Sequence, residues 1–94
     1  MELKKLLKVR IYFKIIKFFH ENPASIDTPR GISTWIGENE NKQSVKKALL
    51  ELSKSKILNA HKVTSTTGYS YTRDSKIVKM IDKALEKIEK EEGK

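Results

Sequence analysis

The sequence predicts an α+β domain that is mostly helical, and two adjacent segments are the reason. Residues 41–55 carry apolar side chains at the spacing of one buried helix face, namely Val45, Ala48, Leu49 and Leu52. Residues 57–72 then alternate in the manner of two strands around a loop of Thr, Ser and Gly. Helical segments lie on both sides, so we expect a two- to three-stranded antiparallel hairpin packed on helices.

Length and composition favour one domain with an anionic partner. The 94 residues suffice for a single core, so we expect one domain over residues 1–90 and a frayed tail over residues 91–94. The net charge of +8 favours a polyanion, although lysine-rich surfaces are also ordinary. The lack of cysteine excludes disulfides and thiolate metal sites. A membrane-spanning run and a signal-peptide core are both missing, so we expect no membrane partner and a cytoplasmic location.

The first element is predicted as one helix over residues 3–21, ended by Asn22 and Pro23. Its apolar residues cover more than half of the helix circumference, whereas one small core needs a stripe of about 100°. The extra apolar face must therefore meet either a second copy of the chain or the C-terminal helix. A basic stripe on the same helix is either solvated or touches a nucleic-acid backbone, and it consists of Arg10, Lys14 and Lys17.

A short second helix is predicted from Thr28 to Gly37. Thr28 suits the N-cap, Pro29 the first helical position, and Gly37 the left-handed residue that closes a helix. Ile26, just before this helix, could anchor a brief strand. One face of the helix is expected to be buried, made of Ile32, Trp35 and Ile36.

The limits of the third helix, the hairpin and the last helix are predicted from capping residues and from the alternation of apolar and polar residues. Asn41, or alternatively Asn39, is expected to cap the third helix, in which the burial of Leu50 is ambiguous. In the hairpin, residues 64–68 form the expected loop. Leu58 and Ala60 are expected on one face of the first strand, and Tyr69 and Tyr71 on the return strand are expected in the core. Thr72 or Asp74 then caps a last amphipathic helix over residues 75–90.

The order helix, short helix, turn, helix, hairpin, helix resembles the winged helix-turn-helix superfamily of transcription regulators. Residues 28–55 correspond to the helix-turn-helix, residues 56–73 to the wing, and residues 75–90 to a C-terminal helix. The turn between Gly37 and Val45 is a little longer than usual. The resemblance implies a double-stranded DNA-binding protein, a transcriptional regulator that places helix 41–55 in the major groove.

The resemblance also implies which side chains would contact DNA. Gln43 is the expected base reader, because glutamine can hydrogen-bond adenine at two positions. Lys42, Lys46 and Lys47 would contact phosphates or bases, and Ser44 would support them. In the wing, whose tip carries no charge, the expected contacts are His61, Lys62, Thr66 and Arg73. The alternatives are an ordinary solvated helix face and a purely structural hairpin.

No catalytic, cofactor or metal site is expected. His20 and His61 are the only histidines, and neither has a second ligand three or four residues away. Nucleotide-binding and nucleophile motifs are also missing, so we expect no enzyme.

Two further questions concern partners. A homodimer through helices 3–21 and 75–90 is expected, with the last helix covering the first one inside the same chain as the alternative. The alternative function is a protein-protein interaction module in a transcription, replication or other assembly. The uncharged wing tip and two acidic residues beside the turn, Glu38 and Glu40, favour it. A third interpretation is binding of RNA or single strands.

Overall fold

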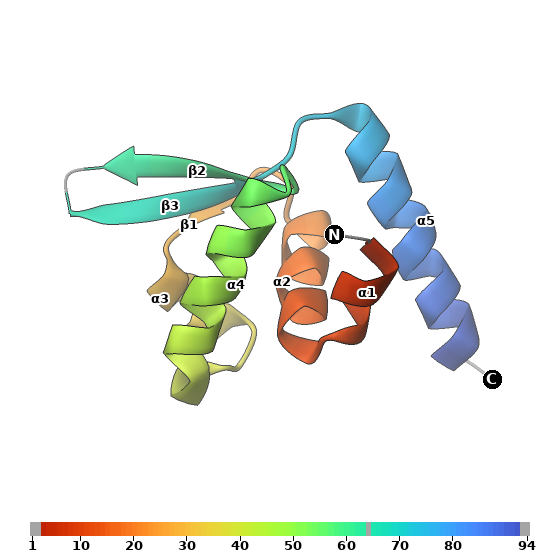
Figure 1. The fold of residues 1–94 in the computed structure, drawn as a ribbon, viewed down its shortest axis with the longest axis horizontal. Coiled ribbons are helices and arrows are strands. Elements are labelled where there is room, and N and C mark those ends of the chain that lie inside the picture. Colours follow the sequence, from red (N-terminus) through yellow and green to blue (C-terminus); the bar gives the residue numbers. More distant parts are fainter. Residues whose placement is uncertain (1–2, 64, 93–94) are drawn as a thin grey trace.

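The computed structural model describes residues 3–63 and 65–92, in which helices surround the base of a small sheet (Figure 1). Thr64 of the expected wing loop and residues 93–94 of the expected tail lie outside the described residues. The elements in chain order are α1 (Leu3–Lys8), α2 (Arg10–Glu21), β1 (Ile26–Asp27), α3 (Pro29–Trp35), the 3-10 helix η1 (Asn39–Asn41), α4 (Lys42–Lys54), β2 (Leu58–Val63), β3 (Thr66–Tyr71) and α5 (Ser75–Glu92).

The prediction of one helix over residues 3–21 is wrong, because the chain breaks at Val9. Val9 has extended backbone angles, with φ −89° and ψ 120°, and separates α1 from α2. In Figure 1, α1 folds back beside α2 and lies between it and α5. Leu6 and Leu7 of α1 are thereby buried, and α5 packs on both N-terminal helices. Much of the wide apolar face of the first segment is therefore covered within the chain, although Val9 is 48% exposed.

The short helix α3 has the predicted boundaries. The hydroxyl oxygen of Thr28 accepts a hydrogen bond from the Gly31 amide at 3.2 Å, and Gly37 has the left-handed φ of 72°. The predicted buried face is only partly correct. Ile32 is fully buried, but Trp35 is 70% exposed, because the last residue of α3 lies at the edge of the face that Ile32 defines.

The sheet has three antiparallel strands in the order β1-β3-β2. Ile26 pairs with Ser70 on one side of β3, and Leu58 pairs with Tyr71 on the other side. Tyr69 and Tyr71 are buried as expected. The predicted loop was too long, because β3 begins at Thr66 and not after Gly68. Ala60 lies on the edge strand β2 and is solvent-exposed, although its partner Tyr69 on the central strand is buried.

The last helix begins as predicted and runs further than expected. The Asp74 carboxylate accepts a hydrogen bond from the Lys76 amide at 2.9 Å, and the Thr72 hydroxyl accepts one from the Asp74 amide at 3.1 Å. Glu91 and Glu92 still belong to α5, so the prediction of a frayed tail from residue 91 is wrong for these two. Core residues from the helices and the sheet form one cluster, including Leu6, Ile15, Ile16, Phe19, Ile32, Leu49, Leu52, Leu58 and Ile81.

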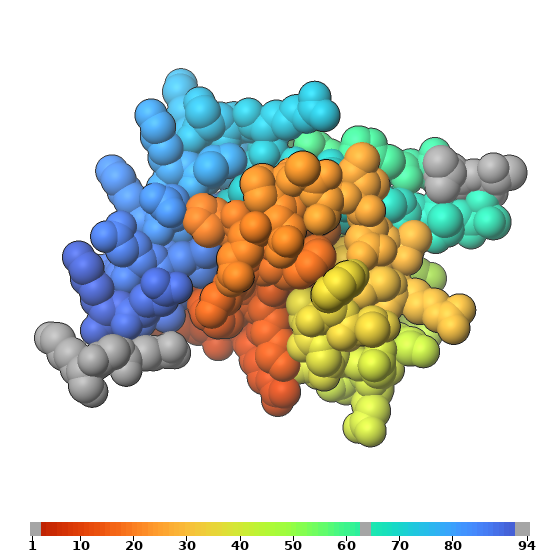
Figure 2. Space-filling model, turned by 180° about the vertical axis from the view of Figure 1, so that it is seen from behind, coloured from red at the N-terminus to blue at the C-terminus, as the bar shows by residue number. Residues whose placement is uncertain are grey.

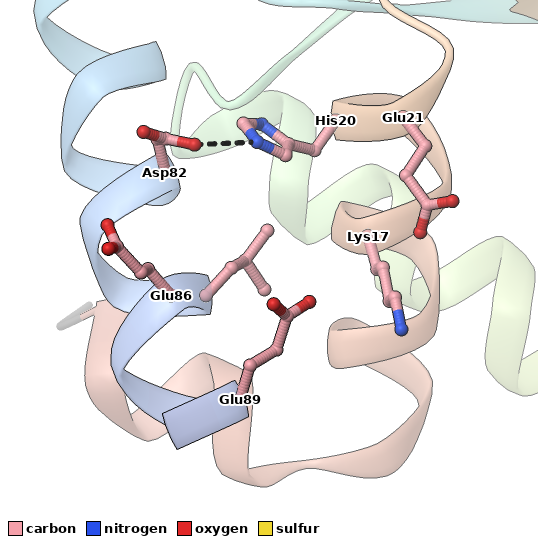
Figure 3. A pocket seen from close by; sticks show the side chains of 7 residues that line it. Lys17, His20, Glu21, Asp82, Glu86 and Glu89 are labelled. Carbon is pink, nitrogen blue, oxygen red and sulfur yellow. Dashed lines mark hydrogen bonds and ion pairs between the residues drawn. The ribbon is translucent and has the colours of Figure 1, made fainter. Parts of the chain in front are cut away.

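His20 makes polar contacts with two other elements, and Figure 3 shows the contact with Asp82. The ring of His20, on α2, lies 3.1 Å from the Asp82 carboxylate of α5 and 3.2 Å from the Tyr71 hydroxyl of β3. An ionised carboxylate only accepts hydrogen bonds, so Nε2–H donates to Asp82 and the Tyr71 hydroxyl can donate to Nδ1. Burial, assisted by the charge of Asp82, raises the pKa of Tyr71 to about 12. The phenol therefore stays protonated and keeps this bond.

Candidate nucleic-acid interface

Helix α4 presents one polar face to solvent and one apolar face to the core. Val45, Ala48, Leu49 and Leu52 are all buried, as predicted. The other residues from Lys42 to Leu50 are exposed, and they include every predicted contact of the helix, Lys42, Gln43, Ser44, Lys46 and Lys47. The core stripe fixes the rotation of the helix, so these side chains are presented together at its N-terminal half.

The exposed face of α4 extends further than the sequence analysis proposed. Leu50, whose burial was ambiguous, is 47% exposed, and Lys54 is 75% exposed with only a long contact of 3.8 Å to Glu51. At 100° per residue, both lie on the same side as Gln43 and Lys47. The same spacing of 100° per residue, applied to the sequence, predicts that Leu50 and Lys54 belong to this face. The face therefore combines four lysines and one glutamate with an apolar side chain at its centre.

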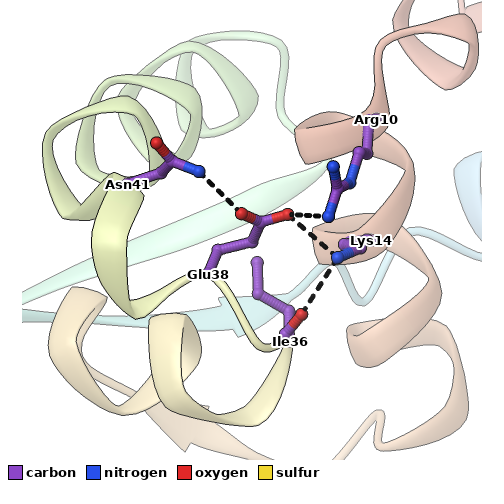
Figure 4. Close-up of polar contacts among 5 residues, drawn as sticks. All are labelled: Arg10, Lys14, Ile36, Glu38 and Asn41. Atoms are coloured by element: carbon purple, nitrogen blue, oxygen red, sulfur yellow. Dashed lines mark hydrogen bonds and ion pairs between the residues drawn. The ribbon is translucent and has the colours of Figure 1, made fainter.

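A buried carboxylate anchors the turn that precedes α4 (Figure 4). The Glu38 side chain is 5% exposed and lies 3.1 Å from the Arg10 guanidinium and 2.9 Å from the Lys14 ammonium, both on α2. The Asn41 side-chain amide also donates a hydrogen bond to Glu38, at 2.8 Å. The hydrogen bond from Lys14, then that from Asn41, holds the pKa of Glu38 below its ordinary value. The start of α4 is thus tied to α2.

This cluster changes three expectations. Asn41 precedes α4, but its side chain donates to Glu38 and makes no capping hydrogen bond with the helix. Glu38 is buried and paired, so it is not an acidic surface for a partner. Arg10 and Lys14 pair with Glu38, so the basic stripe is partly neutralised, although the Arg10 side chain is still 74% exposed. The Lys17 ammonium lies 5.8 Å from the centre of the Phe13 ring. The η1 turn also accounts for the length between Gly37 and Val45.

The wing carries its predicted contacts on two opposite faces. Lys62 pairs with Thr67, and the preceding residue, His61, pairs with Gly68. Neighbouring residues of a strand point to opposite faces of the sheet. Paired residues share a face of an antiparallel ladder, so Lys62 lies on the face of the buried Tyr69. His61 and Thr66 lie on the other face, where the His61 ring is 2.7 Å from the Ser70 hydroxyl. All three are exposed, but only Lys62 shares the helix-facing side of the sheet.

Arg73 is exposed in the link between β3 and α5. Figure 1 shows this link beside the C-terminal end of α4, far from the N-terminal half that carries Gln43. The predicted contacts of α4 therefore lie together, and Arg73 lies apart from them. The predicted contacts of the wing lie on two opposite faces of the hairpin.

Other chemistry has little support in the described residues. The cavity of about 260 Å³ beside His20, shown in Figure 3, is lined by Lys17 and four carboxylates. Within residues 3–63 and 65–92, no three His, Asp or Glu side chains are grouped closely enough to hold a metal ion. None of the helices in this part of the chain is long and apolar enough to cross a membrane.

Known structures share this arrangement. The crystal structure of the AntR antimony-specific transcriptional repressor is similar with a TM-score of 0.72 and 19% sequence identity, covering 96% of this chain and 77% of that one. A possible transcriptional regulator from Methanosarcina mazei Go1 is similar with a TM-score of 0.67 and 15% identity, covering 97% and 79%. The chain has the winged helix-turn-helix fold. No protein-family model and no curated protein sequence matches it. At such identities the likeness establishes the fold alone, with α3 and α4 as the helix-turn-helix and β2–β3 as the wing.

Proposed function

We propose that this winged helix-turn-helix protein binds double-stranded DNA as a transcriptional regulator and inserts α4 into the major groove. The observation that carries the proposal is the exposed face of α4, where Gln43 and three lysines stand opposite a fully buried stripe. A helix of this width fits the major groove, and lysines there neutralise phosphates. The likeness in fold to two transcription regulators supports the same conclusion.

The roles of the side chains follow from their positions. Gln43 reads a base edge, Lys42, Lys46 and Lys47 contact phosphates or bases, and Ser44 donates to a phosphate. Leu50 is placed to contact a thymine methyl group. In the wing, Lys62 is the strongest candidate, since it shares a sheet face with the residues that pack on the helices. His61, Thr66 and Arg73 are secondary candidates. This function requires no catalytic residue, and a cytoplasmic location stays part of the proposal.

Titration of a labelled duplex at two salt concentrations tests the proposal. For each neutralised phosphate, the logarithm of the binding constant should fall by about 0.9 per logarithmic unit of salt. In the double variant Lys46→Glu/Lys47→Glu, the slope of this plot should become shallower by about 2, because two phosphate contacts are lost. Lys83→Glu/Lys87→Glu, which makes the same change of charge on exposed positions of α5, is the matched control and should bind nearly as the unchanged protein.

Two outcomes would contradict the proposal: no binding at low salt, or equal weakening in both double variants. A single-stranded competitor in the same titration addresses RNA and single-strand binding, since groove entry by α4 requires that the duplex bind more tightly. Binding of a protein partner without any duplex binding would favour the interaction module instead.

A homodimer through residues 3–21 and 75–90 stays a prediction. The two-fold symmetry of such a dimer would present two copies of α4 to half-sites about 34 Å apart. The intramolecular packing of α5 on α1 and α2 covers much of the apolar surface that motivates it, and Val9 and Met80 are the large apolar side chains of these helices that stay exposed. Light scattering at micromolar concentration, with and without duplex, measures the state, and a monomer under both conditions would exclude the dimer.

A further inference from the structure

A groove with an apolar floor and a basic rim lies between α1 and α5. It exists because the chain breaks at Val9 and folds α1 back beside α5. Its volume is about 500 Å³, which lies in the range of small-molecule sites. Leu7, which is buried, and the partly buried Ala84 and Ile88 form the floor. We call this surface the α1–α5 groove.

The rim of the groove is positively charged on both helices. Lys4 and Lys8 belong to α1 and Lys87 belongs to α5, and all three are exposed. Glu91 is the one carboxylate among the described residues of the lining, so three positive charges face one negative charge. No ion pair joins any of these lysines to a carboxylate whose side chain the structure describes. The groove therefore has uncompensated positive charge.

The carboxylates of α5 are mostly on its other side. Asp82, Glu86 and Glu89 line the cavity next to α2, whereas α1 consists of lysines and leucines alone. Lys4 and Lys8 also lie four residues apart on one helix, where like charges repel each other. An anion bound in the groove would relieve this repulsion, and a cation would add to it.

We propose that the α1–α5 groove binds a small amphipathic carboxylate, a free fatty acid of medium length, which packs its hydrocarbon chain on Leu7 and Ile88 and places its carboxylate among the three lysines. The apolar floor favours the hydrocarbon chain, because burying it removes apolar surface from water. A membrane surface or a duplex could touch the tips of the lysines, but Leu7 is only 5% exposed and lies too deep for a flat surface to reach. The groove is therefore suited to a small ligand that enters it.

The α1–α5 groove lies away from the proposed DNA contacts. Figure 2 shows α5 (blue) and the start of α4 (yellow-green) on opposite sides of the molecule, with α2 (orange) between them, and Figure 1 shows the same order. The protein can therefore hold the carboxylate and a duplex at once. This inference goes beyond DNA binding and does not depend on it.

Isothermal titration calorimetry with decanoate, below the concentration at which it forms micelles, tests the proposal. Decanoate should bind with a saturable heat, and decyltrimethylammonium, which has the same chain and the opposite charge, should not. Dodecanoate should bind about tenfold more tightly than decanoate, because two more methylene groups are buried. Lys87→Glu should weaken decanoate binding about fivefold, while the matched control Lys79→Glu, at an exposed position of α5 outside the groove, should leave it unchanged.

Several results would overturn the proposal. These are no saturable heat with decanoate up to about 1 mM, equal binding of decyltrimethylammonium, or equal weakening by Lys87→Glu and Lys79→Glu. Cosedimentation with phosphatidylglycerol vesicles in the absence of decanoate binding would identify a membrane surface as the occupant, which also overturns it. The double variant Lys46→Glu/Lys47→Glu, made to weaken duplex binding, should bind decanoate normally. Loss of decanoate binding in that variant would place the carboxylate on α4 instead.

Discussion

Two neighbouring leucines of α4 allow the orientation of this helix to be tested by one identical substitution. Leu49 is 0% exposed and Leu50 is 47% exposed. Leu49→Ala removes buried methyl groups and leaves a cavity, which should lower the free energy of unfolding by about 3 kcal/mol. Leu50→Ala removes side-chain atoms that are half solvated and leaves no cavity, so the loss should stay below about 1 kcal/mol. The total free energy of unfolding of a small domain is about 5–15 kcal/mol, so the difference between the two variants should be easy to measure.

Urea unfolding followed by circular dichroism measures both variants. With a slope of about 1 kcal/mol per molar urea, the midpoint of Leu49→Ala should fall by about 3 M, and that of Leu50→Ala by less than about 1 M. Duplex affinity should respond in the opposite order. Leu50→Ala should bind about fivefold more weakly, because its side chain lies on the proposed groove face, while folded Leu49→Ala should bind normally. Equal destabilisation by both changes would refute the assigned rotation of α4.

Two further predictions concern titrating groups. The pKa of Glu38 is lowered in the folded state, so its ionised form stabilises the fold above the unfolded pKa, and this contribution is lost as the pH falls through the folded pKa. Glu38→Gln should therefore have a lower urea midpoint than the unchanged protein at neutral pH and the same midpoint in strong acid; a constant difference would contradict the ion-pair role. The pKa of Tyr71 is raised to about 12, so stability should be full below the unfolded value of 10.0 and fall as the pH rises through 12. Tyr71→Phe should reduce this alkaline loss in the same measurement, and an unchanged loss would mean that other groups cause it.

Much of the fold is encoded locally and could be predicted. The cap at Thr28, the left-handed Gly37, the stripe that begins at Val45 and the alternation of Tyr69 and Tyr71 all act over a few residues. Each depends on backbone geometry or on the periodicity of one element.

The failures depend on contacts between distant segments. Nothing local marks a break at Val9, since neither proline nor glycine is present there. The break lets Leu6 and Leu7 reach the core near α5, so it is stabilised by contacts with a distant segment of the chain. The pairing of Glu38 with Arg10 and Lys14 spans more than 20 residues and was likewise not predicted. The candidate face of α4 could be predicted because one helix defines it, whereas the division of the wing depends on strand register.

The short strand β1 has a mechanical consequence for the wing. Its two residues pair only with Tyr69 and Ser70, so the base of the hairpin is a three-stranded sheet and the outer part, around Lys62 and Thr67, is a two-stranded ribbon. Two-stranded ribbons twist more readily than wider sheets. The outer ribbon is therefore expected to twist more strongly than its three-stranded base. Because β1 leads directly into the N-cap of α3 at Thr28, that base is tied to the first helix of the motif.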